Sequence, residues 1–141
     1  MITIPLLLVE RAVVGLVLLV ATITDLRRRQ VPLWLSLGFI ASGVALGTLR
    51  GPDGLFACLL GLAAGTLPVV PFVVVGGFGG ADLLLLGAIG AWEGWHFVLL
   101  AEVCTALIGA AMALVARYRH EISIPYVPAI LVGTAFAFFA V

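Results

Sequence analysis

Six apolar stretches alternate with short polar or Gly/Pro-rich segments along the whole chain. The stretches cover residues 4–24, 33–48, 55–75, 82–95, 97–116 and 125–141. Each predicts a helix, because none shows the strict alternation of a half-buried strand. The fourth is short, since its 14 residues would reach only ~21 Å at about 1.5 Å per residue. It must be sunk in a bundle, tilted against a thinned membrane region, or begun within the preceding Gly-rich segment.

Composition turns this pattern into a membrane prediction. Hydrophobic residues make up 64% of the sequence and charged residues only 10%, and the mean hydropathy is +1.32. An ordinary soluble domain is about half apolar and about a quarter charged. Helices are expected to carry the stretches across a hydrocarbon core of about 30 Å. The expected fold is an all-α, polytopic membrane bundle of about six transmembrane helices, forming one domain over residues 1–141.

Arginine placement predicts how the bundle sits in the membrane. Residues 27–29 are all arginine and follow the first stretch, and Arg117 and Arg119 follow the fifth. Loops rich in Lys and Arg stay in the cytoplasm, so these two ends share the cytoplasmic side and both termini lie on the extracytoplasmic side. The same count brings Asp25 and Asp82 to one membrane depth, at the cytoplasmic face.

Glu10, Arg11 and Glu102 are ionisable residues well inside apolar stretches. Glu10 and Arg11 fall about two turns into the first stretch, and Glu102 falls about two turns into the fifth from the same side. Ionisable groups at membrane depth usually have a partner or a function. We favour an ion pair that ties the two helices together over a role in transport.

The two cysteines do not predict a metal site or a disulfide. Cys58 and Cys104 each lie within an apolar stretch, with no C-x-x-C motif and no metal-ligand spacing. They are interpreted as small buried hydrophobic residues.

Asp25 and Asp82 are the two acids with the strongest claim to chemistry. Asp25 closes the first apolar stretch, and Asp82 follows the Gly-rich residues 76–81. Glycine lets the backbone approach another chain closely or adopt a positive φ. Each acid also has a structural explanation: Asp25 could pair with the arginines at 27–29, and Asp82 could cap the helix that it begins.

Two carboxylates at one depth permit aspartyl hydrolysis. When they are close, they cannot both be ionised, so they share a proton. One then activates a water for attack on a peptide carbonyl while the other, protonated, polarises that carbonyl. The pair titrates as a unit, so acid and base are not assigned separately. No Ser-His-Asp arrangement competes, since His96 is predicted outside and His120 has no obvious nucleophile beside it.

Three motifs surround these acids. Residues 24–32 read TDLRRRQVP, residues 79–82 read GGAD before a helix that contains Gly87 and Gly90, and residues 124–129 read IPYVPA. Together, in this order and over essentially the whole chain, they resemble the type IV prepilin peptidases, the GxGD-type aspartyl proteases of membranes. The resemblance is strongest to the short form that serves tight-adherence (Flp) pili.

The resemblance assigns roles to individual residues. It implies that Asp25 and Asp82 are catalytic, and that a further set positions the loop and substrate: Gly79, Gly80, Ala81, Pro32, Pro125 and Pro128. Two positions depart from the family pattern. Ala81 replaces the second glycine of the box, which adds one methyl group, and Leu84 replaces a lysine, which removes a cation beside the pair.

The implied reaction is cleavage of the class III signal peptide of a pilin-like precursor at the cytoplasmic face of the bacterial inner membrane. The implied partners are this precursor and the lipid bilayer, with no nucleic acid, no cofactor and no metal, and a homo-oligomer is left open. Long-form relatives add a cytoplasmic region with paired C-x-x-C motifs and N-methylate the new terminus. This sequence lacks that region, so we expect peptidase activity alone.

Two alternative functions use the same residues differently. A small ion- or proton-coupled transporter would bind its cation at the two acids, although transporter sites usually lie near the membrane midplane. A catalytically degenerate family member, altered at Ala81 and Leu84, would act in pilus assembly without cleaving the precursor.

Overall fold

The computed structural model describes residues 3–120 and 124–141, and all regular structure in these residues is helical. The helices are α1 (Thr3–Arg28), α2 (Leu33–Leu49), α3 (Pro52–Thr66), α4 (Val70–Val74), α5 (Gly80–Glu93), α6 (Trp95–Tyr118) and α7 (Val127–Ala140). The all-helical prediction is confirmed for this part of the chain. Residues 121–123, between the fifth and sixth apolar stretches, lie outside it.

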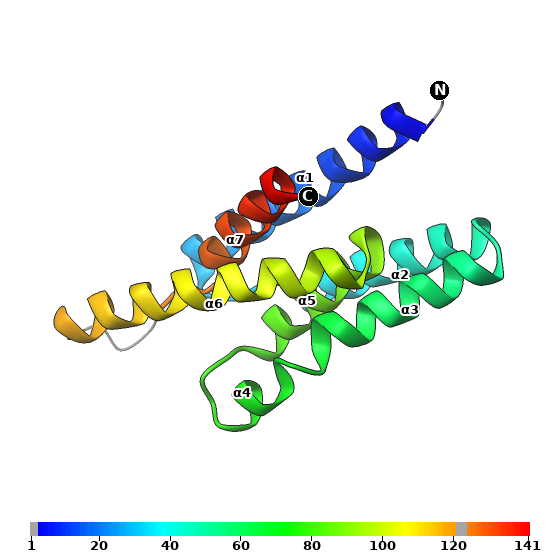
Figure 1. Cartoon of the computed structure of the whole chain (residues 1–141). Helices are drawn as coiled ribbons and strands as arrows, with labels where there is room; N and C mark the ends of the chain where they lie inside the picture. Colours follow the sequence, from blue (N-terminus) through cyan, green and yellow to red (C-terminus); the bar gives the residue numbers. More distant parts are fainter. Residues whose placement is uncertain (1–2, 121–123) are drawn as a thin grey trace.

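Within the residues that the structure describes, two helices are long and apolar enough to cross a membrane, at Leu7–Arg28 and Trp95–Tyr118. Helices α2, α3 and α7 are apolar but shorter. The helices of the bundle alternate in direction. Helices α1, α3 and α6 run one way, and helices α2, α5 and α7 run the other way (Figure 1). The end of α1 and the start of α5 therefore lie at one end of the bundle.

The third predicted helix is wrong as a single element. Helix α3 ends at Thr66, and the short α4 begins only at Val70. Pro68 lies in the turn between them, and proline both lacks an N–H donor and clashes with the carbonyl four residues earlier in a continuing helix. The chain therefore turns, and α4 projects from the side of the bundle (Figure 1).

Helix α5 is the centre of the bundle, which explains how so short a helix fits. It begins at Gly80, inside the Gly-rich segment, and contacts α1, α2, α3 and α6. All seven residues from Leu85 to Ala91 are buried. The backbones of α3 and α5 touch at Gly61 and Gly90, where a Cβ on either glycine would clash with the carbonyl of the other. Small residues at a contact permit such close helix packing.

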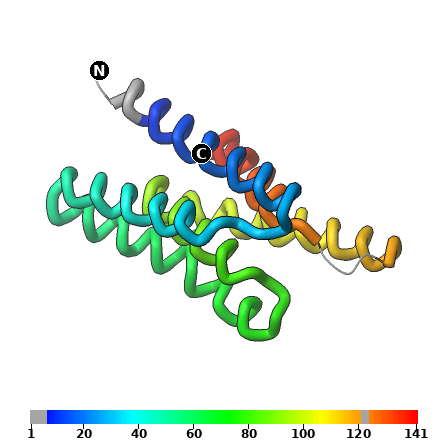
Figure 2. The backbone as a smooth tube through the Cα atoms, turned by 180° about the vertical axis from the view of Figure 1, so that it is seen from behind, coloured from blue at the N-terminus to red at the C-terminus, as the bar shows by residue number. Residues whose placement is uncertain are grey.

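Helices α1 and α7 form the remaining side of the bundle. They lie next to each other in both views (Figure 2), and α7 also packs along α6. Buried side chains from α1, α5, α6 and α7 join one hydrophobic core, in which Val14, Leu85, Val98 and Ile130 are fully buried. This packing brings the start of α7 against the end of α1.

Candidate active site

Asp25 lies one turn before the end of α1 and is almost fully buried, with 7% of its surface exposed. Its Oδ2 accepts a hydrogen bond of 3.2 Å from the backbone N–H of Val127, the first residue of α7. The first N–H groups of a helix have no partner within the helix. Asp25, on another helix, supplies the missing acceptor for the N–H of Val127. This hydrogen bond fixes the orientation of the Asp25 carboxylate. The positive charge of Arg29 also attracts the carboxylate of Asp25.

Asp82 lies in the first turn of α5, three residues after the N-cap residue Gly79. Its carboxylate is hydrogen-bonded to the backbone of Gly79. An acid at this position that reaches back to the N-cap is half of a capping box. Asp82 therefore caps α5, as the structural explanation predicted. The same contact with Gly79 holds the Asp82 side chain at the start of the helix.

The fold brings the two acids to the same end of the bundle. Asp25 comes from the end of α1 and Asp82 from the start of α5, and the two carboxylates are near enough to repel each other electrostatically. Repulsion between two carboxylates that are shielded from water favours one shared proton. Two carboxyl groups that share a proton can act as a general acid and a general base.

The residues of the Gly-rich box differ in how much room the structure leaves for a side chain. A Cβ on Gly79 would lie 2.8 Å from Oδ2 of Asp82, whereas a Cβ on Gly80 would meet nothing within 4 Å. Ala81 packs its methyl group against the hydrophobic core. Its carbonyl oxygen lies 3.4 Å from the hydroxyl of Ser36, a long contact that links α2 to the first turn of α5. Leu84 is half-buried.

The three prolines singled out from the sequence all lie at helix starts. Pro32 is the N-cap residue of α2, and Pro128 lies in the first turn of α7. Pro125 precedes Tyr126, the N-cap residue of α7. Proline suits the first turn of a helix, where an N–H would lack a partner. Pro125 and Pro128 therefore flank the backbone segment that carries the Asp25 contact.

Sequence reasoning missed three residues that build this end of the bundle. The rings of Phe78 and Tyr126 meet edge to face with centroids 4.9 Å apart, and a Cβ on Gly109 of α6 would lie 2.7 Å from the Tyr126 ring. Ser36 is fully buried. Tyr126 and Phe78 had a signal in the sequence, because they sit inside or beside the recognised motifs. Ser36 had none.

The ion pairs differ from the predicted one. Glu10 pairs with Arg50, and Arg11 Nε lies 4.0 Å from Glu93 Oε2. The predicted pairing of Glu10 or Arg11 with Glu102 is wrong, because α1 packs against α5 and α7 and not against α6 closely enough to bring those side chains together. Within the described part of the chain, the Oε1 atom of Glu102 is buried without a hydrogen-bond partner.

Metal ligation has no candidate among the residues that the structure describes. No group of three or more His, Cys, Asp or Glu side chains lies close enough there to hold a metal ion. Cys58 and Cys104 are both free thiols, the first buried and the second half-buried.

Comparison with known proteins gives one consistent result. The family model described as the type IV leader peptidase family matches residues 12–114. The chain is 31% identical over 127 residues to a prepilin leader peptidase/N-methyltransferase of Bacillus subtilis, covering 86% of this chain and 51% of the relative. A protein of the same name from Aeromonas hydrophila is 29% identical over 123 residues, which cover 79% of this chain and 42% of that protein.

A third relative with this name, from Burkholderia pseudomallei, is 40% identical over 67 residues, which cover 45% of this chain and 22% of the relative. The chain thus spans about half the length of the Bacillus protein and less of the other two. No solved structure matches it.

Proposed function

Because the chain belongs to the type IV leader peptidase family, we propose that it is a prepilin leader peptidase, an aspartic endopeptidase with Asp25 and Asp82 as its catalytic pair. The observation that carries the proposal is the meeting of these two acids at one end of the bundle, where their charges interact. The substrate is a pilin-like precursor, cut between its leader and the apolar segment that follows.

The reaction is written for the pair and not for either acid alone. The ionised carboxylate takes a proton from a water molecule, whose oxygen attacks the carbonyl carbon of the scissile bond. The protonated carboxyl donates its proton to the carbonyl oxygen, so the tetrahedral intermediate carries no net charge there. As the intermediate collapses, the C–N bond breaks, one carboxyl of the pair gives its proton to the leaving nitrogen, and the other carboxylate takes a proton from a hydroxyl of the intermediate. The pair is left with one proton, as at the start. The backbone contacts of Val127 and Gly79 hold the two carboxylates in place during these steps.

The membrane arrangement belongs to the same proposal. Helices α1, α2, α3, α5, α6 and α7 form six spans, with both termini outside the cytoplasm and the aspartates at the cytoplasmic face of the inner membrane. The alternating helix directions and the arginines at the ends of α1 and α6 support it. A C-terminal alkaline phosphatase fusion, active only outside the cytoplasm, should be active. An inactive fusion of normal abundance would reverse the orientation.

Cleavage is tested by co-expressing the chain with a pilin precursor and following the size shift on leader removal. The wild type should cleave, and Asp25→Asn and Asp82→Asn should not. Asp53→Asn is the matched control, because Asp53 is an exposed acid in the first turn of α3, distant from the pair. Cleavage by either Asn variant at the pair would remove the dyad assignment.

The same assay separates the alternatives. A wild type that folds but cleaves no precursor from several pilus systems would favour the degenerate assembly factor or the transporter. The relatives' names also include an N-methyltransferase activity. Peptidase activity alone is our prediction for this chain, and mass measurement of the product's new N-terminus, after incubation with a methyl donor, tests it.

A further inference from the structure

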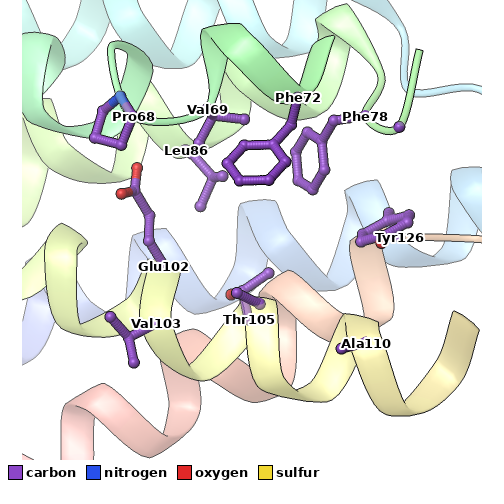
Figure 3. Close-up of a pocket in the computed structure, with 12 residues that line it drawn as sticks. Pro68, Val69, Phe72, Phe78, Leu86, Glu102, Val103, Thr105, Ala110 and Tyr126 are labelled. Atoms are coloured by element: carbon purple, nitrogen blue, oxygen red, sulfur yellow. The ribbon is translucent and has the colours of Figure 1, made fainter. Parts of the chain in front are cut away.

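An apolar groove runs along α6 beside the candidate active site. Its volume is ≈ 390 Å³, and it is enclosed by α6 on one side and by the turn after α3, α4 and the Gly-rich segment on the other. Phe72, Phe78 and Leu86 form much of its wall (Figure 3). Nearly all of its lining is apolar, so water is a poor occupant.

One end of this groove lies next to the two aspartates. Phe78, which directly precedes Gly79, and Tyr126, which directly precedes Val127, both line the groove. The backbones of Gly79 and Val127 are hydrogen-bonded to Asp82 and Asp25. When the scissile bond of a peptide lies at the aspartates, the adjoining segment of that peptide can therefore enter the groove.

The groove extends about two helical turns away from this end. Ala110, Ala106 and Glu102 line it from one face of α6, at spacings of four residues. Eight residues at about 1.5 Å each span ~12 Å. Ala110 lies near Tyr126 at one end, and Glu102 lies near Pro68 at the other (Figure 3).

Glu102 is the one carboxylic acid among the residues that line the groove. Its carboxyl group points across the groove toward Pro68 (Figure 3), and its Oε1 atom is buried with no hydrogen-bond partner among the described residues. An unpaired carboxyl group in an apolar setting is costly. A lipid chain has no hydrogen-bonding group to offer it, whereas a peptide side chain does.

We propose that the groove binds the first two turns of the apolar segment that follows the scissile bond, and that Glu102 selects substrates with a hydrogen-bonding side chain in that segment. This inference rests on the proposed peptidase function. The groove then sets where along the precursor the aspartates act, and Glu102 is a specificity residue about two turns from the reacting bond.

Blocking the groove after folding tests the first half. In a background of Cys58→Ala and Cys104→Ala, Ala106→Cys is purified and then labelled with a bulky maleimide. Ala111→Cys, exposed on α6 but outside the groove, is the matched control. Labelling at 106 should lower kcat/KM for the cleaved precursor by about tenfold or more, and labelling at 111 by less than about twofold. Equal effects at the two positions would overturn the groove assignment and leave a lipid as its occupant.

A substrate scan tests the role of Glu102. A single Gln is placed in turn at each of the first eight positions after the scissile bond of a precursor that the wild type cleaves, with Leu at the same position as reference. The wild type should favour Gln over Leu by about tenfold in kcat/KM at one position or at two positions a turn apart. Glu102→Leu should lose this preference, so that its kcat/KM values for the Gln and Leu substrates agree within about twofold.

The outcomes separate the two proposals. An unchanged Gln preference in Glu102→Leu would refute the specificity role of Glu102 and leave the proposed peptidase function intact. A wild type that cleaves no precursor removes the peptidase function and this inference with it.

Discussion

One methyl group added at Gly79 should displace Asp82 without straining the backbone. Gly79 has φ −78° and ψ 144°, an extended conformation that alanine adopts freely. Its missing Cβ matters for another reason, because a Cβ there would lie 2.8 Å from Oδ2 of Asp82. Ordinary contacts to a Cβ begin at 3.4 Å, so the carboxylate must retreat by about 0.6 Å.

This displacement gives the expected loss of activity. A misplacement of about 1 Å in a reacting group can cost about 100-fold in rate. We therefore expect Gly79→Ala to lower kcat by about tenfold, or ~1.4 kcal/mol in activation free energy. KM should change little, since the substrate groove is untouched.

Gly80→Ala is the matched control for this variant. It adds the same methyl group one residue later, where a Cβ meets nothing within 4 Å. It should keep kcat within about twofold of the wild type, and an alanine in the first turn of α5 should slightly raise thermal stability.

The assay is cleavage of a purified precursor in detergent or liposomes, with kcat and KM measured for the wild type, Gly79→Ala and Gly80→Ala. Circular dichroism melting and gel filtration establish that each variant is folded. A folded Gly79→Ala with wild-type kcat would refute the argument. An equal loss in Gly80→Ala would refute it too, since the contact with Asp82 is present at Gly79 and absent at Gly80.

Three predictions concern the stability of the bundle, each measured by thermal unfolding in detergent. Glu10→Gln removes the charged partner of the Arg50 guanidinium and should lower the unfolding free energy by about 2 kcal/mol. This value is smaller than for a fully buried pair, because Arg50 is partly exposed. The double variant with Arg50→Gln should recover part of this loss. Gly61→Ala forces α3 away from α5 and should cost about 2–3 kcal/mol, whereas Gly38→Ala, with nothing within 4 Å of the new Cβ, should not destabilise. Trp92→Phe removes an indole N–H that donates to a backbone carbonyl of α2 at 3.0 Å and should cost about 1 kcal/mol. A Gly38→Ala variant as unstable as Gly61→Ala, or a double charge variant less stable than Glu10→Gln, would contradict these assignments.

The sequence was enough to predict that the chain is helical and that Asp25 and Asp82 lie at helix ends. Hydropathy is a property of consecutive residues, so the all-helical fold and most helix bounds follow from it without knowledge of packing. Asp25 and Asp82 stand at helix ends in an otherwise apolar chain, and flanking motifs mark them. Their placement at one end of the bundle follows from counting helices that alternate in direction.

The break after α3 was missed because Pro68 lies inside an apolar run that hydropathy cannot distinguish from a continuous helix. A proline signals a bend but not whether the chain kinks or turns away, and here it turns into α4.

Side-chain partners across helices were decided by the tertiary structure alone. The sequence predicts comparable depths for Glu10 and Glu102, yet one reaches Arg50 and the other faces an apolar groove. The difference depends on the rotation of each helix about its axis and on which neighbour it touches. Those are set by close contacts such as that between Gly61 and Gly90, which join residues far apart in the sequence. Depth in a membrane is thus a one-dimensional quantity that the sequence carries, whereas the groove beside the aspartates exists only once the helices have packed.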